Sequence, residues 1–383
     1  MSVTSPQGFR AAGVAAGIKE SGTPDVAVVI NDGPGAAAAG VFTANRVKAA
    51  PVLWSQQVLA GHTVRAVVLN SGGANACTGP VGFQDTHRTA EHMAGLLDVG
   101  AGEVAVCSTG LIGERLPISS LLAGVTDAAG QASTDGGLAA ADAIRTTDTV
   151  AKTCAVQGTG YQIGGMAKGA AMLAPALATM LVVLTTDADL LPADLDAALR
   201  SAVGSTFDRL DTDGCMSTND TVLLLASGAS GTVPDKAEFA GLLTQACADL
   251  ADQMQADAEG ARKAITIEVT GAATEQDAVV VGRAVARCTL LKCAIGGEDP
   301  NWGRVLAAVG TTNAAFEPDQ LSVAINGVWV CKGGQPGEDR SAVDLAPRDV
   351  TITVDLAAGH HGAAIRTTDL TAEYVHLNSA YST

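Results

Sequence analysis

The chain has 383 residues and a formal net charge of −17, which argues against nucleic acids and anionic membranes as partners. Hydrophobic residues make up 47% of the sequence and aromatic residues only 3%, so we expect a large interior of closely packed Ala, Val and Leu. No apolar run reaches the length of a membrane span, the N-terminus has no signal-peptide pattern, and the cysteines form no CxxC pair. We therefore expect a cytoplasmic protein of two domains.

Short apolar strands that end in polar, glycine-rich loops are predicted through the first third of the chain. These strands span residues 25–30, 65–69 and 103–106. The loops that follow begin at Asn31, Asn70 and Cys107. Such loops present backbone N–H groups and short polar side chains at a sheet edge, where functional sites are often built.

The stretch Lys168–Leu181 contains Ala178-Thr179, followed by an apolar run over residues 180–184. The run predicts a strand that is buried on both faces. If the chain cuts itself between Ala178 and Thr179, Thr179 becomes an N-terminal residue. Its own amine, with a pKa of about 7.7–8.0, can then take the proton from its hydroxyl and activate it as a nucleophile. On spacing alone, the pattern also fits an ordinary buried strand that begins with threonine.

Further elements follow from periodicity and turn signals. Predicted helices span residues 84–97, 133–144 and 277–292. Two more are predicted, one that begins at Pro192 and one whose apolar face runs from Phe239 to Met254. Predicted strands span residues 221–225, 265–269 and 350–354, and an Asn326-Gly327 hairpin lies within 323–330. We expect an α+β fold with a large domain over 1–235 and a smaller α/β domain over 236–383.

Two short patterns are candidates for chemistry. Thr109-Gly110 ends a strand, where a hydroxyl and an N–H could stabilise an oxyanion, although the sequence alone favours a plain strand-to-turn transition. Lys168 is the only charge within 163–180, so it either binds a substrate carboxylate or extends its ammonium to solvent. The segment 257–263 is interpreted as a solvated helix end.

No phosphate-binding loop, dinucleotide fingerprint, HExxH or zinc spacing occurs in the sequence. We therefore expect no metal and no cofactor.

Several motifs in order resemble one family, the ornithine acetyltransferases, also called glutamate N-acetyltransferases, of cyclic arginine biosynthesis. The motifs are residues 41–45 (VFTAN), 70–79 (NSGGANACTG), 108–113 (STGLIG), 146–149 (TTDT), 164–169 (GGMAKG), 178–181 (ATML), 299–304 (DPNWGR) and Asn378. One departure is Arg262, at a position where family members often have threonine.

The resemblance implies a layered αββα core of the N-terminal-nucleophile type, shared with some aminopeptidases, plus a smaller α/β domain. It implies self-cleavage between Ala178 and Thr179 into chains 1–178 and 179–383 that stay together as α2β2 or a larger assembly. Thr179 would be the nucleophile, and Thr109 and Gly110 the oxyanion hole. The implied substrate-binding residues are Thr146, Lys168, Thr179, Glu259, Asn378 and Thr383.

The implied reaction transfers the acetyl group of N-acetylornithine to glutamate through an acetyl-threonine intermediate, without a cofactor. Whether acetyl-CoA is also an acetyl donor stays open. The alternative is an N-terminal-nucleophile aminopeptidase or amidase, in which water accepts the acyl group.

Overall fold

The computed structural model describes residues 1–173 and 180–380 and divides into two compact units. The first unit holds Met1–Asp208 and Cys215–Met254, and the second holds Arg209–Gly214 and the described residues after Met254. The division differs from the boundary expected at residue 235, because helix α6 (Lys236–Ala256) packs into the first unit. Its Phe239 ring lies 5.9 Å from the ring of Tyr161.

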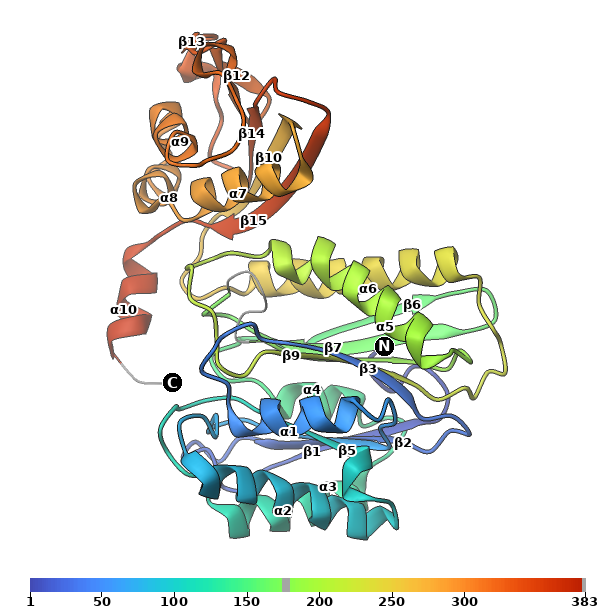
Figure 1. Cartoon of the computed structure of the whole chain (residues 1–383). Coiled ribbons are helices and arrows are strands. Elements are labelled where there is room, and N and C mark those ends of the chain that lie inside the picture. The colour runs from blue at the N-terminus through green and yellow to red at the C-terminus, as the bar shows by residue number, and fades with distance from the viewer. Residues whose placement is uncertain (174–179, 381–383) are drawn as a thin grey trace. The chain divides into compact units, whose positions relative to one another are not determined.

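The first unit contains two β-sheets. The four-stranded sheet has the order β1 (Phe9–Val14), β2 (Val26–Asn31), β4 (Ala66–Asn70), β5 (Val104–Ser108). The five-stranded sheet has the order β3 (Ala37–Phe42), β9 (Thr221–Ala226), β8 (Leu181–Thr186), β7 (Gln162–Lys168), β6 (Lys152–Gln157). Helices α2 (Gly79–Leu97) and α3 (Ile118–Gln131) cover the first sheet, and α5 (Pro192–Ser205) and α6 cover the second (Figure 1). The predicted αββα layering is confirmed.

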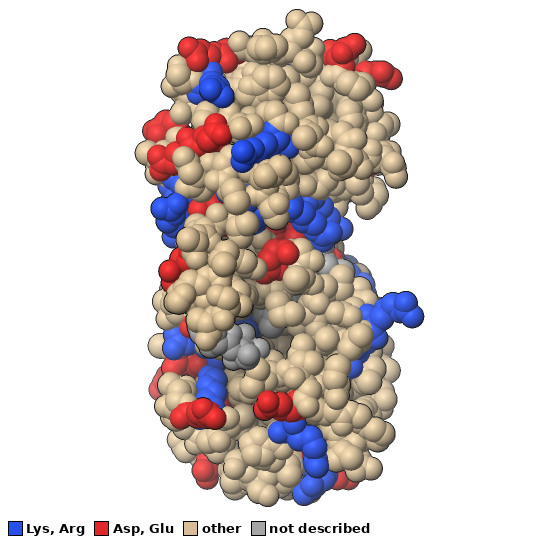
Figure 2. All heavy atoms as spheres, turned by 90° about the vertical axis from the view of Figure 1, so that its left-hand side faces the viewer, with Lys and Arg blue, Asp and Glu red and all other residues tan. Residues whose placement is uncertain are grey.

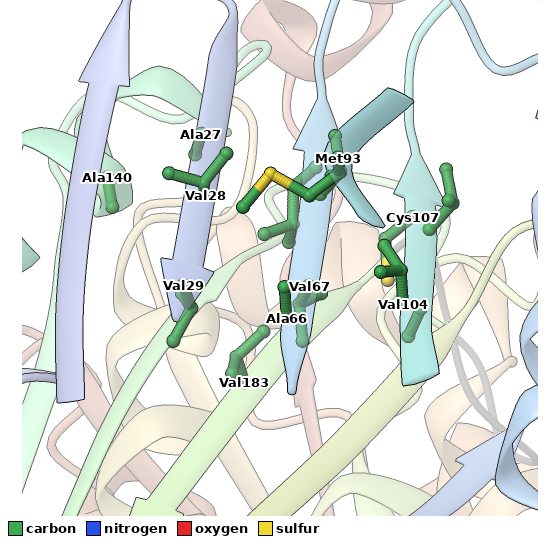
Figure 3. Close-up of a cluster of buried hydrophobic side chains, with 14 of the residues drawn as sticks. Ala27, Val28, Val29, Ala66, Val67, Met93, Val104, Cys107, Ala140 and Val183 are labelled. Carbon is green, nitrogen blue, oxygen red and sulfur yellow. The ribbon is translucent and has the colours of Figure 1, made fainter. Parts of the chain in front are cut away.

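The inner faces of the two sheets form one hydrophobic core. Val67 of β4 and Val183 of β8 are fully buried members of it, and they lie close together between the sheets (Figure 3). Small β-branched and alanine side chains dominate this core, as the low aromatic content predicts. Strands β2, β4, β5, β8 and β9 are buried along their whole length, which explains their continuous apolar runs.

Helix α1 (Ala50–Leu59) lies along the edge strand β5. The indole Nε1 of Trp54 donates to the Val104 carbonyl at 3.0 Å, and the Ser55 hydroxyl donates to the Val106 carbonyl at 2.7 Å. These bonds satisfy edge carbonyls that would otherwise be buried without partners. At the other edge of this sheet, α4 (Gly137–Ala143) packs against β1.

The second unit is built on a mixed six-stranded sheet. Its order is β13 (Gln335–Pro336), β12 (Val328–Lys332), β11 (Ser322–Ile325), β14 (Asp349–Asp355), β10 (Ala264–Ala272), β15 (His361–Thr368). Its helices are α7 (Glu275–Ala286), α8 (Thr289–Gly296), α9 (Trp302–Val309) and α10 (Ala372–Ala380). The short 3₁₀ helices of the chain are Ala101–Glu103, Phe207–Arg209, Pro318–Gln320 and Arg340–Ala342.

Two predictions for this unit have opposite outcomes. The hairpin is confirmed, since Asn326 and Gly327 join β11 and β12 with φ values of 46° and 82°. The single helix over 277–292 is wrong, because Cys288 adopts an extended ψ of 97° between α7 and α8. None of the described helices combines the length and apolar character needed to cross a bilayer.

Candidate active site

The end of strand β5 places Thr109 and Gly110. Strand β5 runs parallel to β4, and the Thr109 N–H continues the ladder by donating to the Asn70 carbonyl at 3.0 Å. Gly110 has a φ of +126°, and a Cβ there would lie 2.5 Å from the Gly73 nitrogen. The backbone can therefore pass here only without a side chain. The hydroxyl of Thr109 is held in a buried, fixed position, which suits an oxyanion donor.

Lys168 is the last residue of strand β7 and is only 2% exposed. The interpretation that its ammonium reaches solvent is therefore wrong. Its Nζ donates to the Thr146 hydroxyl at 2.8 Å and lies 3.4 Å from the Thr109 hydroxyl. Three residues expected at the site thus meet, although they come from three distant segments of the chain.

A second buried lysine and a carboxylate, neither of them predicted, complete this cluster. The side chains of Asp148 and Lys152 are fully buried, and the Lys152 ammonium lies 2.6 Å from Asp148 Oδ1. The same oxygen accepts the Gly169 N–H at 2.7 Å. Burial by itself would raise the pKa of Asp148, but the charges of Lys168 and Lys152 outweigh it and hold the pKa at about 2.

The sequence offered one usable signal for this cluster. Asp148 and Lys152 stand four residues apart between otherwise weakly charged segments. A lysine that opens a half-buried strand is unusual enough to suggest a fixed partner.

Asp220 supports the residue that follows Thr179. Its side chain is fully buried, and Oδ1 accepts the Met180 N–H at 3.0 Å. No hydrogen-bond partner is found for its Oδ2 within residues 1–173 and 180–380. Burial raises the pKa of Asp220 well above its ordinary value, against the opposing effects of the Met180 N–H and the Lys168 charge.

Asn219, the neighbour of Asp220, connects this segment to the end of β5. Its Nδ2 donates to the carbonyls of Ala74 and Ser108, at 2.6 and 2.8 Å. The backbone before Thr109 and the backbone after Thr179 are therefore tied to adjacent residues of one loop. Ala178 and Thr179 themselves lie outside the described residues.

Glu259 and Asn378 both lie in the second unit. The Asn378 amide, on α10, donates to Glu259 Oε2 at 2.8 Å. Glu259 stands in the turn after α6, beside Gly260 with its φ of +62°. The contact pairs two of the expected substrate-binding residues within their own unit, and Thr383 lies outside the described residues.

The segment expected to be a solvated helix end is partly buried. Lys263 is 6% exposed, and its ammonium donates to the carbonyls of Ala346 and Pro347 at 3.2 and 3.1 Å. It therefore ties the residue before strand β10 to the loop before β14. The solvated interpretation is wrong for Lys263.

Groups of three or more His, Cys, Asp or Glu side chains that could bind a metal ion do not occur within the described part of the chain. The clustered groups are instead hydroxyls, lysines and single carboxyls. Such a set can bind anions and stabilise a developing oxyanion.

Residues 10–383 match the ArgJ family over almost the entire chain. The chain belongs to the ArgJ family. It is 70% identical over 383 residues to the arginine biosynthesis bifunctional protein ArgJ of Thermobifida fusca (strain YX), and the alignment covers both chains completely. It is 68% identical to the protein of the same name from Streptomyces avermitilis, again over the full length of both chains.

One solved structure also matches part of this chain. It is ornithine acetyltransferase from Mycobacterium tuberculosis complexed with ornithine, with 59% identity and a TM-score of 0.45, and the match covers 47% of this chain and 96% of that chain. The family resemblance inferred from the ordered motifs is therefore confirmed by sequence relatives that span the whole protein.

Proposed function

We propose that this ArgJ-family chain is a glutamate N-acetyltransferase that moves the acetyl group of N-acetylornithine to glutamate. The observation that carries the proposal is the buried Lys168 ammonium, which lies within hydrogen-bonding distance of the hydroxyls of Thr109 and Thr146. This cluster offers a cation for a substrate carboxylate next to a hydroxyl that can stabilise an oxyanion.

The nucleophile of the proposed reaction is Thr179, released by cleavage of the Ala178–Thr179 bond. Its α-amine takes the hydroxyl proton while the oxygen attacks the acetyl carbonyl. Thr109 and Gly110 stabilise the negative charge that develops on the carbonyl oxygen. The bond to ornithine then breaks, the amine of Thr179 returns the proton to the leaving nitrogen, and an acetyl ester of Thr179 remains.

Glutamate completes the cycle. Its amine attacks the ester carbonyl and gives a proton to the α-amine of Thr179. That proton passes to the Thr179 oxygen as it leaves, and acetylglutamate is formed with the free hydroxyl restored. Lys168 binds the carboxylate that both amino acids carry, and Thr146, Glu259, Asn378 and Thr383 complete the substrate contacts. Two half-reactions through one covalent intermediate predict parallel lines in double-reciprocal plots.

The assembly and location follow as parts of the same proposal. Cleavage gives chains 1–178 and 179–383, which stay associated as α2β2 or a larger assembly in the cytoplasm. No nucleic-acid or membrane partner is proposed, because the net charge is −17 and Lys and Arg are interspersed with Asp and Glu on the face in Figure 2. No cofactor is required, and acetyl-CoA as a second donor is left to experiment.

Denaturing mass spectrometry and an acetyl-transfer assay test the proposal together. We expect two species whose masses sum to the full chain plus one water, with Thr179 as a new N-terminus. Thr179→Ala should give one intact, inactive chain. An active Thr179→Ala protein would overturn the assignment, and release of acetate faster than acetylglutamate would favour the amidase alternative.

A further inference from the structure

Lys19 is a half-buried lysine that the proposed chemistry does not use. Its Nζ donates to the carbonyl oxygen of Pro24 at 2.9 Å and to that of Arg145 at 2.7 Å. These bonds use two of the three N–H donors of an ammonium. Both partners are uncharged, so they fix the position of the ammonium without neutralising it.

A buried carboxylate fixes the loop that carries Lys19, between β1 and β2. The side chain of Asp25 is fully buried, and its oxygens accept the backbone N–H groups of residues 16, 18 and 19 at 2.7, 2.6 and 3.0 Å. Because the loop is already ordered, a ligand that binds to the Lys19 ammonium does not have to order the backbone.

The Lys19 side chain adjoins two parts of the candidate active site within the first unit. Its partner Arg145 immediately precedes Thr146, one of the expected substrate-binding residues. On the other side, a Cβ added to Gly72 would lie 3.1 Å from Lys19 Cγ. Gly72 Cα in turn lies 3.0 Å from the position of a Cβ added to Gly110. Lys19 is therefore next to both the Thr146 segment and the proposed oxyanion hole.

The charges around Lys19 favour an anionic ligand. Burial lowers the pKa of Lys19, Asp25 opposes the shift, and the charges of Arg145 and Lys168 add to it. Lys19 and Lys168 are thus near enough to repel each other. Lys168 has Asp148 as an ion-pair partner at 3.8 Å, whereas the hydrogen-bond partners of Lys19 Nζ are neutral carbonyls. Lys19 therefore adds a positive charge that its hydrogen bonds do not cancel, which suits a carboxylate.

We propose that Lys19 is a specificity residue that binds the side-chain carboxylate of glutamate in the second half-reaction. N-acetylornithine carries one carboxylate and a cationic side chain, whereas glutamate carries two carboxylates. An additional ammonium therefore favours the acceptor and offers nothing to the donor. The inference rests on the proposed function, because it identifies how that site selects its acceptor.

The two half-reactions should respond differently when this charge is lost. In a ping-pong reaction, kcat/KM for each substrate reports only the half-reaction in which that substrate takes part. Lys19→Gln keeps a side-chain donor for the carbonyls but carries no charge. We expect kcat/KM for L-glutamate to fall about tenfold or more, as for a lost charged hydrogen bond, and kcat/KM for N-acetyl-L-ornithine to stay within about threefold of wild type.

A competition between two acceptors measures the selectivity directly. L-Glutamate and L-glutamine, in which an uncharged amide replaces the side-chain carboxylate, are offered at equal concentrations with N-acetyl-L-ornithine as donor. Mass spectrometry quantifies the two acetylated products. Their ratio equals the ratio of the kcat/KM values, so it does not depend on the fraction of active enzyme. Wild type should favour acetylglutamate, and Lys19→Gln should lose about tenfold of that preference.

Lys236→Gln is the matched control. Lys236 begins α6 in the same unit, its side chain is 74% exposed, and its ammonium pairs with Asp194. The same change in net charge at this position should leave the product ratio unchanged. If Lys19→Gln yields no folded protein, Lys19→Met replaces it in the competition.

The outcomes are distinct. A product ratio within about twofold of wild type in the Lys19 variant would overturn the inference. An equal fall in kcat/KM for donor and acceptor would also overturn it, because a residue that only joins two loops should affect both half-reactions alike. Wild type that acetylates both acceptors equally well would overturn it without any variant. If wild type transfers no acetyl group to either acceptor, the proposed function itself fails.

Discussion

Each unit buries a lysine whose ammonium meets a threonine hydroxyl, but the two lysines are in different electrostatic environments. Lys168, 2% exposed, donates to Thr146 and has Asp148 at 3.8 Å. The pKa of that carboxyl is about 2. An ionised carboxylate therefore lies beside Lys168.

Lys292 of the second unit is 5% exposed and donates to the Thr367 hydroxyl at 3.2 Å and to the Thr212 carbonyl. Burial lowers its pKa to about 8, although nearby carboxylates, with Asp213 first, oppose the shift. Two lysines of similar burial thus have different carboxylates and hydrogen-bond partners around them. Burial alone therefore does not identify a functional lysine.

The largest effect on activity is expected when the charge of Lys168 is removed. Lys168→Met should lower kcat/KM for acetyl transfer by about 100-fold, because removing one partner of a buried, hydrogen-bonded charge costs about 3 kcal/mol. Steady-state kinetics on protein confirmed as cleaved by mass spectrometry measures this loss. A decrease of less than about threefold would contradict the role of Lys168.

Gly110→Ala should act on the same site through the backbone. A Cβ at Gly110 would meet the Gly73 nitrogen at 2.5 Å and would require a left-handed φ. We expect about a tenfold or greater loss of kcat and destabilisation by about 1–3 kcal/mol, measured by single-turnover kinetics and urea unfolding.

Gly113 offers the matched control, because its φ is +89° but nothing lies within 4 Å of an added Cβ. Gly113→Ala should show the cost of φ strain without the collision. Equal losses of kcat in both variants would assign the effect to strain rather than to the approach of Gly73.

The lowered pKa of Lys292 predicts that stability depends on pH. Its folded pKa of about 8 lies below the reference value of 10.5, so between these pH values the unfolded chain holds a proton that the folded chain has released. Stability therefore rises with pH across this window, by about 3 kcal/mol for a shift of this size. Lys292→Met should remove that part of the increase.

Urea unfolding of wild type and Lys292→Met at pH 7, 8, 9 and 10 measures the difference. The stability of wild type relative to the variant should increase steadily above pH 8. A constant difference across the series would mean that Lys292 keeps its ordinary pKa in the folded protein.

The smallest effect on stability is expected at the exposed hydrogen bond between Glu259 and Asn378 in the second unit. Glu259→Gln keeps an acceptor for the Asn378 amide but removes the charge, so the free energy of unfolding should change by less than about 0.5 kcal/mol. If Glu259 binds substrate, KM for N-acetylornithine should still rise about fivefold or more, as for a lost charged contact. Glu373→Gln, on exposed α10, is the control that should leave KM unchanged.

The sequence by itself determined the elements whose signals are local. Strands β8 and β9 follow from continuous apolar runs, and the β11–β12 hairpin follows from Asn326-Gly327, because these patterns depend only on neighbouring residues. The order of short motifs also identified the family. Strand β7 was not predicted, since Gly164 and Gly165 weaken its pattern, and only pairing with β6 and β8 makes it a strand.

Only the tertiary structure decided what surrounds Lys168. Thr109 and Thr146 stand 59 and 22 residues away in the chain, and no periodicity links them to a lysine at the end of β7. Asp148 and Lys152 stand only four residues apart, but nothing in the sequence links this pair to Lys168. Sheet register and loop closure bring these groups together. Once the groups are buried, the energy of each charge depends on the neighbouring charges. Local sequence patterns contain neither the placement of the groups nor this coupling.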